Sequence, residues 1–278
     1  MDQQAVQQFR AEVMARKNLP TIPTVLAKIL QLVDAETASG KDLIAVVERD
    51  QALTGKLLRL ANSAFFGQSR KVSTIPRAVV LLGFSTVRNL ALSVKVWETL
   101  GAGVSRSRLE ELWRHAVAVA MATKALTTRL RAGDPEEAFT AGLLHDVGRL
   151  LLAMRFRDDY WRAVGGAGEV EAVDRLEAEH LGIDHAEVGS WVLEAWNLPP
   201  SIVELVAQHH APTPRPGLPG LLAIADRLVV WTDLGSGALR PEGEMLVASA
   251  GERGLTPTIW QDVVGRLRDD PALGQLEG

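Results

Sequence analysis

The sequence contains no cysteine, which excludes disulfide bonds and thiolate-based metal sites. No apolar stretch reaches the roughly 18 residues that a membrane-spanning helix requires, and the first residues lack the features of a signal peptide. The net charge of −4 provides no broad attraction to nucleic acid or to anionic membranes. We therefore expect a cytoplasmic protein that does not associate with membranes and for which nucleic acid is an unfavourable partner.

Helical signals dominate the 278 residues, of which 47% are hydrophobic. Residues 39–42 (Ser-Gly-Lys-Asp) form a capping-box pattern, and Asp50 and Thr74 stand where they can cap the next two helices. Gly83 is expected to end one helix before a longer one runs from Ser85 to about Trp97. Since no sustained alternation of apolar and polar residues occurs, the sequence predicts an all-α protein of many short helices.

The distribution of histidine predicts three parts. Residues 1–104 contain no histidine and are expected to form a helical bundle, with a hinge at residues 101–103 and the polar run 105–111. Residues 105–235 hold all six histidines and are interpreted as a second helical part, with a proline-rich loop after residue 210. Residues 236–278 are predicted to form peripheral helices with a frayed end.

His145 and Asp146 are adjacent within an apolar run at residues 141–149, which we interpret as the middle of a helix. A buried imidazole beside a buried carboxylate is unfavourable unless a partner such as a divalent metal pairs them. Asp226 is the only acid in another apolar helical run, where an unpaired carboxylate would also be unfavourable. The remaining candidate metal ligands are all histidines, namely His115, His185, His209 and His210.

A set of imidazole and carboxylate ligands without sulfur suits iron, manganese, zinc or nickel. Such a site commonly activates water for phosphoester hydrolysis. Each residue also has a purely structural interpretation: His185 can begin a helix, the pair 209–210 can favour a helix C-terminus, and Asp226 can pair with Arg227 or a neighbouring helix. We interpret His180 as a histidine outside the site.

The order of His115, His145-Asp146 and Asp226 resembles the H…HD…D pattern of the HD superfamily of metal-dependent phosphohydrolases. The histidines at 185, 209 and 210 look like the additional ones of its HD-GYP branch, which hydrolyses cyclic di-GMP. The sequence departs from that branch after residue 210, where Ala-Pro-Thr-Pro replaces the acidic residue and the Gly-Tyr-Pro motif. Arg149 stands where these enzymes often have lysine.

A series of motifs that begins in the first half of the chain resembles the HDOD domain, an HD-related output domain of bacterial signalling proteins. The similarity begins at residues 19–23 (Leu-Pro-Thr-Ile-Pro) and continues in order through residues 50–67, 75–84, 113–115, 142–149 and 184–189. It extends over roughly residues 15–232. The resemblance implies a multi-helix HDOD fold, with an N-terminal helical bundle packed on an HD-like helical subdomain.

Two functions follow from this resemblance. The first is a bacterial signal-transduction module with a metal-binding HD-like site and no catalysis, which would act on a signalling protein or respond to a nucleotide second messenger. The alternative is a metal-dependent phosphohydrolase that acts on nucleotides or cyclic dinucleotides. In either case Arg149 is a candidate contact for phosphate or carboxylate. Arg59, Asn62 and Ser63 form a candidate partner surface at a helix end, although packing of the bundle also explains them.

Overall fold

A computed structural model describes residues 2–17, 19–34, 39–63, 66, 71–164, 173–210, 217–232 and 238–268. No β-strand occurs within these ranges, where a single bridge pairs Thr232 with Leu239. The all-α prediction is therefore confirmed. None of the helices in the described ranges combines the length and the apolar character needed to cross a bilayer.

Five α-helices come first in the described part of the chain, and three of them begin at the caps that the sequence predicts. They are α1 (Gln3–Met14), α2 (Thr24–Asp34), α3 (Gly40–Val47), α4 (Gln51–Ala61) and α5 (Ile75–Leu82). Ser39 and Asp42 form the expected capping box of α3, while Asp50 and Thr74 cap α4 and α5 through their side chains. Gly83, with a φ of 88°, separates α5 from α6 (Phe84–Leu100), which extends one residue before and three beyond the predicted limits.

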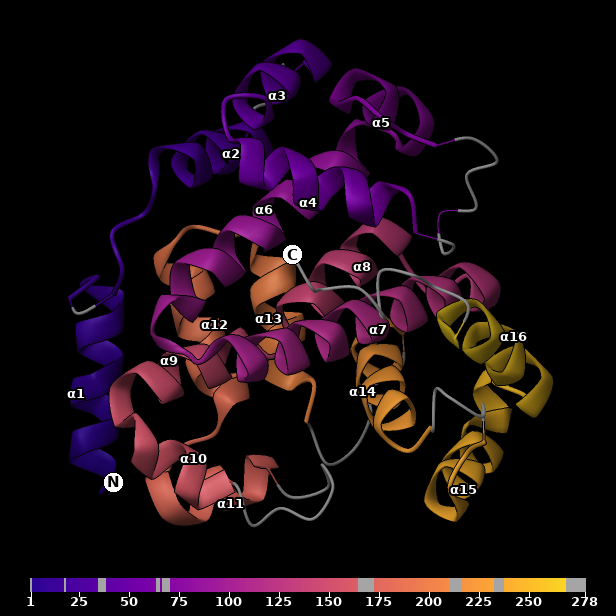
Figure 1. Ribbon diagram of the computed structural model, residues 1–278. Helices are drawn as coiled ribbons and strands as arrows, with labels where there is room; N and C mark the ends of the chain where they lie inside the picture. Colours follow the sequence, from indigo (N-terminus) through magenta and orange to yellow (C-terminus); the bar gives the residue numbers. More distant parts are fainter. Residues whose placement is uncertain are drawn as a thin grey trace.

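Helix α6 is the centre of the fold. It packs against α2, α3, α4 and α5 on one side and against α8 (Pro135–Leu144) and α9 (Val147–Phe156) on the other (Figure 1). Thirteen of its 17 residues are buried, as expected for a helix enclosed on most sides. By contrast, α1 lies apart from α2–α5 and packs on α12 (His185–Ala195), where Phe9 meets Trp191 edge to face at 5.9 Å.

Among the remaining helices, α7 (Arg106–Leu130) packs against α8, α14 and α16. The bounds of the others are α10 (Asp158–Val164), α11 (Val173–Leu181), α13 (Pro200–Gln208), α14 (Leu218–Val230), α15 (Pro241–Ser249) and α16 (Pro257–Arg268). The proline-rich loop at 211–216 and the chain end at 269–278 lie outside the described residues.

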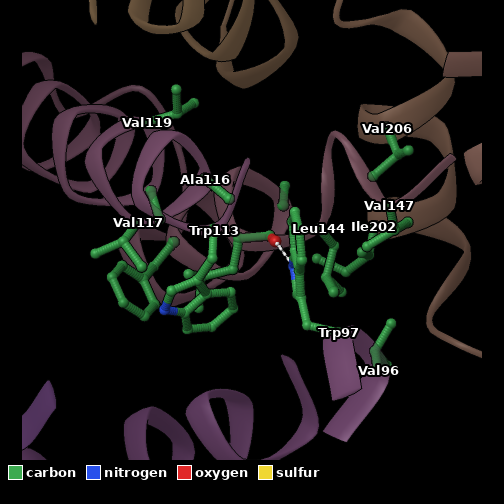
Figure 2. Close-up of a cluster of buried hydrophobic side chains, with 14 of the residues drawn as sticks. Val96, Trp97, Trp113, Ala116, Val117, Val119, Leu144, Val147, Ile202 and Val206 are labelled. Atoms are coloured by element: carbon green, nitrogen blue, oxygen red, sulfur yellow. Dashed lines mark hydrogen bonds between the residues drawn. The ribbon is translucent and has the colours of Figure 1, made fainter. Parts of the chain in front are cut away.

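A pair of tryptophans joins α6, α7 and α8. Trp97 and Trp113 meet edge to face at 5.4 Å, and the indole Nε1 of Trp97 donates to the Leu143 carbonyl at 2.6 Å (Figure 2). Both side chains are buried among apolar neighbours from several helices. Since Leu143 lies two residues before His145, this hydrogen bond fixes α6 to the helix end that positions the histidine.

Two local predictions are wrong. Residues 106–111, predicted as part of a hinge, form the first turns of α7, where Arg106 pairs with Glu110 one turn later, and residues 101–103 form a short 3-10 turn before it. The pair 145–146 does not lie in mid-helix but in the break between α8 and α9. Asp146 occupies the N-cap position of α9 but makes no side-chain capping hydrogen bond. Its carboxylate contacts Arg149 and His185 instead.

Candidate metal centre

Glycines allow the helices that carry the site to approach one another closely. A Cβ added to Gly148 of α9 would lie 1.9 Å from the carbonyl oxygen of His185, and one added to Gly142 of α8 would lie 2.4 Å from the Cα of Ala120 in α7. Only glycine permits such contact between backbones. As a result, the break that carries the HD pair lies directly against the first turn of α12 and the middle of α7.

Four residues form the first group of candidate ligands. The Nε2 atom of His185, at the start of α12, lies 3.0 Å from Asp146 Oδ1, 3.2 Å from His209 Nε2 and 2.9 Å from His210 Nε2. The two consecutive histidines follow the end of α13 as predicted, and His209 Nε2 is 3.9 Å from Asp146 Oδ1. The four ligand atoms are close enough to share one ion.

The second group consists of His115, His145 and Asp226. The Oδ1 atom of Asp226, from α14, lies 2.9 Å from His115 Nε2 and 3.6 Å from His145 Nε2. Asp146 connects the groups, since its oxygens are 3.5 Å from His145 Nε2 and 4.0 Å from His115 Nε2. The structure therefore brings together all seven residues predicted as ligands, in two adjoining groups that can hold metal.

Hydrogen bonds to backbone carbonyls orient two of the imidazoles. The Nδ1 atoms of His145 and His209 donate to the carbonyls of Gly142 and Val206, each at 2.7 Å. With the proton on Nδ1, each ring presents the lone pair of Nε2 to the centre. His145 Nε2 is buried and has no hydrogen-bond partner among the described residues. An orphaned acceptor that faces two carboxylates fits a divalent cation between them.

The electrostatics of the centre favour ionised carboxylates. Burial by itself raises the pKa of Asp146, but His145, Arg149 and His185 lower it well below the ordinary value. Asp226 follows the same pattern: burial by itself raises its pKa, but the hydrogen bond from His115 and the charge of nearby His145 lower it well below the ordinary value. Two buried carboxylates among several imidazoles match the ligand preference of divalent transition metals.

Burial, followed by the charges of neighbouring histidines, lowers the pKa of His209 well below the ordinary value. This imidazole is therefore neutral at physiological pH and can act as a ligand. His185 behaves oppositely, because Glu177 and Asp146 outweigh its burial and raise its pKa. A metal at this group has to displace a proton from His185, since a ligating imidazole must be neutral at the ligating atom.

Two buried residues near the centre escape the sequence analysis. Glu177 of α11 is fully buried and receives hydrogen bonds from His185 Nδ1 at 2.6 Å, from the His185 backbone N–H at 2.8 Å and from the Tyr160 hydroxyl at 2.8 Å. Because Glu177 lies in a charged run at 174–180 that looks like a solvated helix face, the sequence gives no signal for it. Tyr160 is the sole tyrosine of the sequence, which is a weak signal.

Arg149 lies at the edge of the centre. It donates from Nη1 to Asp146 Oδ2 and from Nε to the Tyr160 hydroxyl, both at 3.2 Å, and 18% of its side chain is exposed. His180 is exposed on α11, with Nδ1 bonded to the Leu176 carbonyl, and belongs to neither group.

The candidate partner residues near the end of α4 differ in exposure. Arg59 is exposed, whereas Ser63 is only 2% exposed. The side-chain amide of Asn62 donates to the carbonyls of Leu58 and Val72 and accepts from the backbone N–H of Val72, so it joins the end of α4 to Val72. This arrangement favours the packing interpretation for Asn62 and Ser63 and leaves Arg59 at the surface. Residues 64–65 and 67–70 lie outside the described ranges.

A comparison with known protein families identifies the family of this chain. Residues 19–212 match the HDOD domain, which is more than half of the chain, and the chain therefore belongs to the HDOD family. The predicted resemblance is confirmed. An uncharacterized protein of Treponema pallidum (strain Nichols) is 26% identical over 201 residues. That alignment covers 69% of this chain, and the chain spans 38% of the length of this curated relative.

Solved structures share the fold of this chain. A provisionally named phosphohydrolase from Shewanella amazonensis SB2B is 26% identical, has a TM-score of 0.73 and is matched over 98% of each chain. A provisionally named signal transduction protein from Marinobacter aquaeolei VT8 is 22% identical, with a TM-score of 0.69 over 98% of this chain and 65% of that one. The second similarity supports the fold alone.

Proposed function

We propose that the protein is a bacterial signal-transduction module whose HD-like centre binds a divalent transition metal and does not turn over a substrate. The observation that carries the metal part is the orphaned Nε2 of His145, buried between the carboxylates of Asp146 and Asp226. An imidazole acceptor held in this way fits a cation between the carboxylates. Iron, manganese, zinc and nickel all accept this donor set.

The proposal of a non-catalytic role rests on two further observations. The sequence after His210 lacks the Gly-Tyr-Pro motif of the related cyclic di-GMP hydrolases. In addition, the guanidinium of Arg149 is already engaged by Asp146 and Tyr160, so binding a phosphate would compete with these contacts. A metal that joins α7, α12, α13 and α14 would instead stabilise one arrangement of these helices.

The alternative function is a metal-dependent phosphohydrolase acting on nucleotides or cyclic dinucleotides. It is favoured by the complete set of seven candidate ligands and by the name of the Shewanella relative. A bound divalent ion would supply Lewis acidity and an activated water for phosphoester hydrolysis. In that case Asp146 and Asp226 would help to hold the ion, and Arg149 would orient a phosphate.

Turnover assays separate the two functions. Purified protein would be supplied with Mn²⁺ or Fe²⁺ and incubated with cyclic di-GMP or bis-p-nitrophenyl phosphate, beside the double variant His145→Ala/Asp146→Ala. We expect the wild type and the double variant to release product at the same background rate. Hydrolysis by the wild type that the double variant lacks would establish the phosphohydrolase instead.

A further inference from the structure

Five side chains close a continuous ring beside the metal centre. Arg149 donates to Asp146 and to the hydroxyl of Tyr160, which in turn donates to Glu177 at 2.8 Å. Glu177 accepts a hydrogen bond from His185 Nδ1 at 2.6 Å. The Nε2 atom of His185 lies 3.0 Å from Asp146 Oδ1, and this contact closes the ring. Two members of the ring, Asp146 and His185, are candidate metal ligands, while the other three belong to neither ligand group.

Glu177 is the member of the ring that most needs an explanation. Its carboxylate is fully buried, although it lies on a short helix whose neighbouring acidic residue, Glu179, is exposed. Burial of a carboxylate is unfavourable unless several donors satisfy it. Tyr160 supplies one donor, and His185 supplies two, from its ring and its backbone. His185 therefore supplies most of the hydrogen bonds that stabilise the buried carboxylate of Glu177.

We propose that Glu177 is a positioning residue for His185, held in place by Tyr160, and that it couples metal binding to the docking of α11. The proposal rests on the proposed function, because it assumes that His185 is a ligand. By accepting from Nδ1, Glu177 directs Nε2 toward the centre and makes the imidazole a more basic ligand, as carboxylate–histidine–metal arrangements do.

The coupling follows from the helices that carry these residues. Tyr160 lies on α10 and Glu177 on α11, and the two helices pack on each other beside α9 and α12 (Figure 1). A metal on His185 strengthens the polarity of its Nδ1–H bond and thus the contact with Glu177. By linkage, an ion that binds better when α11 is docked must stabilise the docked state of α11 by the same factor. The ring thereby connects the buried centre to helices near the surface.

A pair of isosteric variants tests this inference. Glu177→Gln keeps the shape and an acceptor for His185 but removes the charge, whereas Glu179→Gln makes the same change on the exposed face of the same helix. The probe is Co²⁺, whose affinity and visible absorption report on its ligands. We expect Glu177→Gln to weaken Co²⁺ binding by about 10–100-fold, as loss of such supporting carboxylates does elsewhere, and to shift the absorption at saturating metal. Glu179→Gln should match the wild type in both measurements.

Hydrogen exchange provides the second readout. Co²⁺ should slow exchange of the backbone amides of α11 in the wild type and in Glu179→Gln, and should slow it less in Glu177→Gln at saturating metal. Tyr160→Phe removes one donor from Glu177 without touching its charge, and should weaken Co²⁺ binding less than Glu177→Gln does. If Glu177→Gln fails to fold, the Co²⁺ affinity of Tyr160→Phe tests the role of Glu177 instead.

The possible failures are distinguishable. If the wild type binds Co²⁺ while Glu177→Gln and Tyr160→Phe bind it with unchanged affinity and unchanged absorption, the role of Glu177 is overturned and the metal centre stands. If α11 exchanges at the same rate with and without bound Co²⁺, the coupling is overturned. If the wild type itself binds no Co²⁺, the proposed function fails, and this inference fails with it.

Discussion

Replacing Gly148 with alanine should both destabilise the protein and weaken its metal centre. The new Cβ would lie 1.9 Å from the carbonyl oxygen of His185 and 2.6 Å from the backbone nitrogen of Gly189. Restoring ordinary contact at about 3.4 Å requires α9 and α12 to separate by roughly 1.5 Å. Both opposing atoms belong to a helix backbone, so no side-chain rotation relieves the overlap.

We expect Gly148→Ala to lower the free energy of unfolding by about 3 kcal/mol, at the upper end of the range for overpacked cores. The separation of α9 from α12 also moves His185 away from Asp146, so Co²⁺ affinity should fall at least tenfold. Urea unfolding gives the first quantity and cobalt titration the second.

Gly265→Ala is the matched control. Gly265 lies within α16, and a Cβ there would meet no atom within 4 Å. Alanine should therefore stabilise the protein by about 0.5–1 kcal/mol through its better helix propensity, and should leave Co²⁺ affinity unchanged. If Gly148→Ala proves as stable as the wild type and binds cobalt equally well, the close crossing of α9 and α12 does not position the site as described.

Three further predictions concern the rest of the fold. Trp97→Phe removes a buried hydrogen bond to the backbone of α8 and should lower the unfolding free energy by about 2 kcal/mol in urea titrations. Asn62→Ala leaves both backbone groups of Val72 without their side-chain partner and should destabilise by a similar amount, about 2 kcal/mol, with no change in metal content. Burial opposes ionisation of Asp50, but the α4 backbone and Lys95 lower its pKa overall, so its stabilising contribution should be present above about pH 4 and lost as the pH falls further. Asp50→Asn keeps a good helix cap and should flatten this acid-induced loss of stability, measured by urea unfolding at several pH values.

The helices of the first half could be predicted from the sequence because their signals are local. Ser39, Asp50 and Thr74 each satisfy backbone donors within three residues, so the sequence alone indicates where α3, α4 and α5 begin. The break after Leu144 was not predictable in this way. The run at 141–149 has helical periodicity throughout, and the helix is interrupted because the Asp146 carboxylate turns to partners on other helices.

The same distinction applies to the centre. The candidate ligands could be selected from the sequence because imidazole and carboxylate in apolar sequence are rare and their order resembles a known family. Glu177 was not, since its burial depends on how α11 packs and not on its neighbours in the sequence. Likewise, the close approach at Gly148 arises only when α9 crosses α12, although the glycine itself is visible in the sequence.

Metal analysis of protein purified without added metal tests the central claim most directly, with His145→Ala/Asp146→Ala and His180→Ala measured alongside. The account predicts about one equivalent or more of a transition metal per chain in the wild type and in His180→Ala, and only background in the double variant. Less than about a tenth of an equivalent in the wild type, even after incubation with excess Fe²⁺, Mn²⁺, Zn²⁺ or Ni²⁺ followed by desalting, would contradict it.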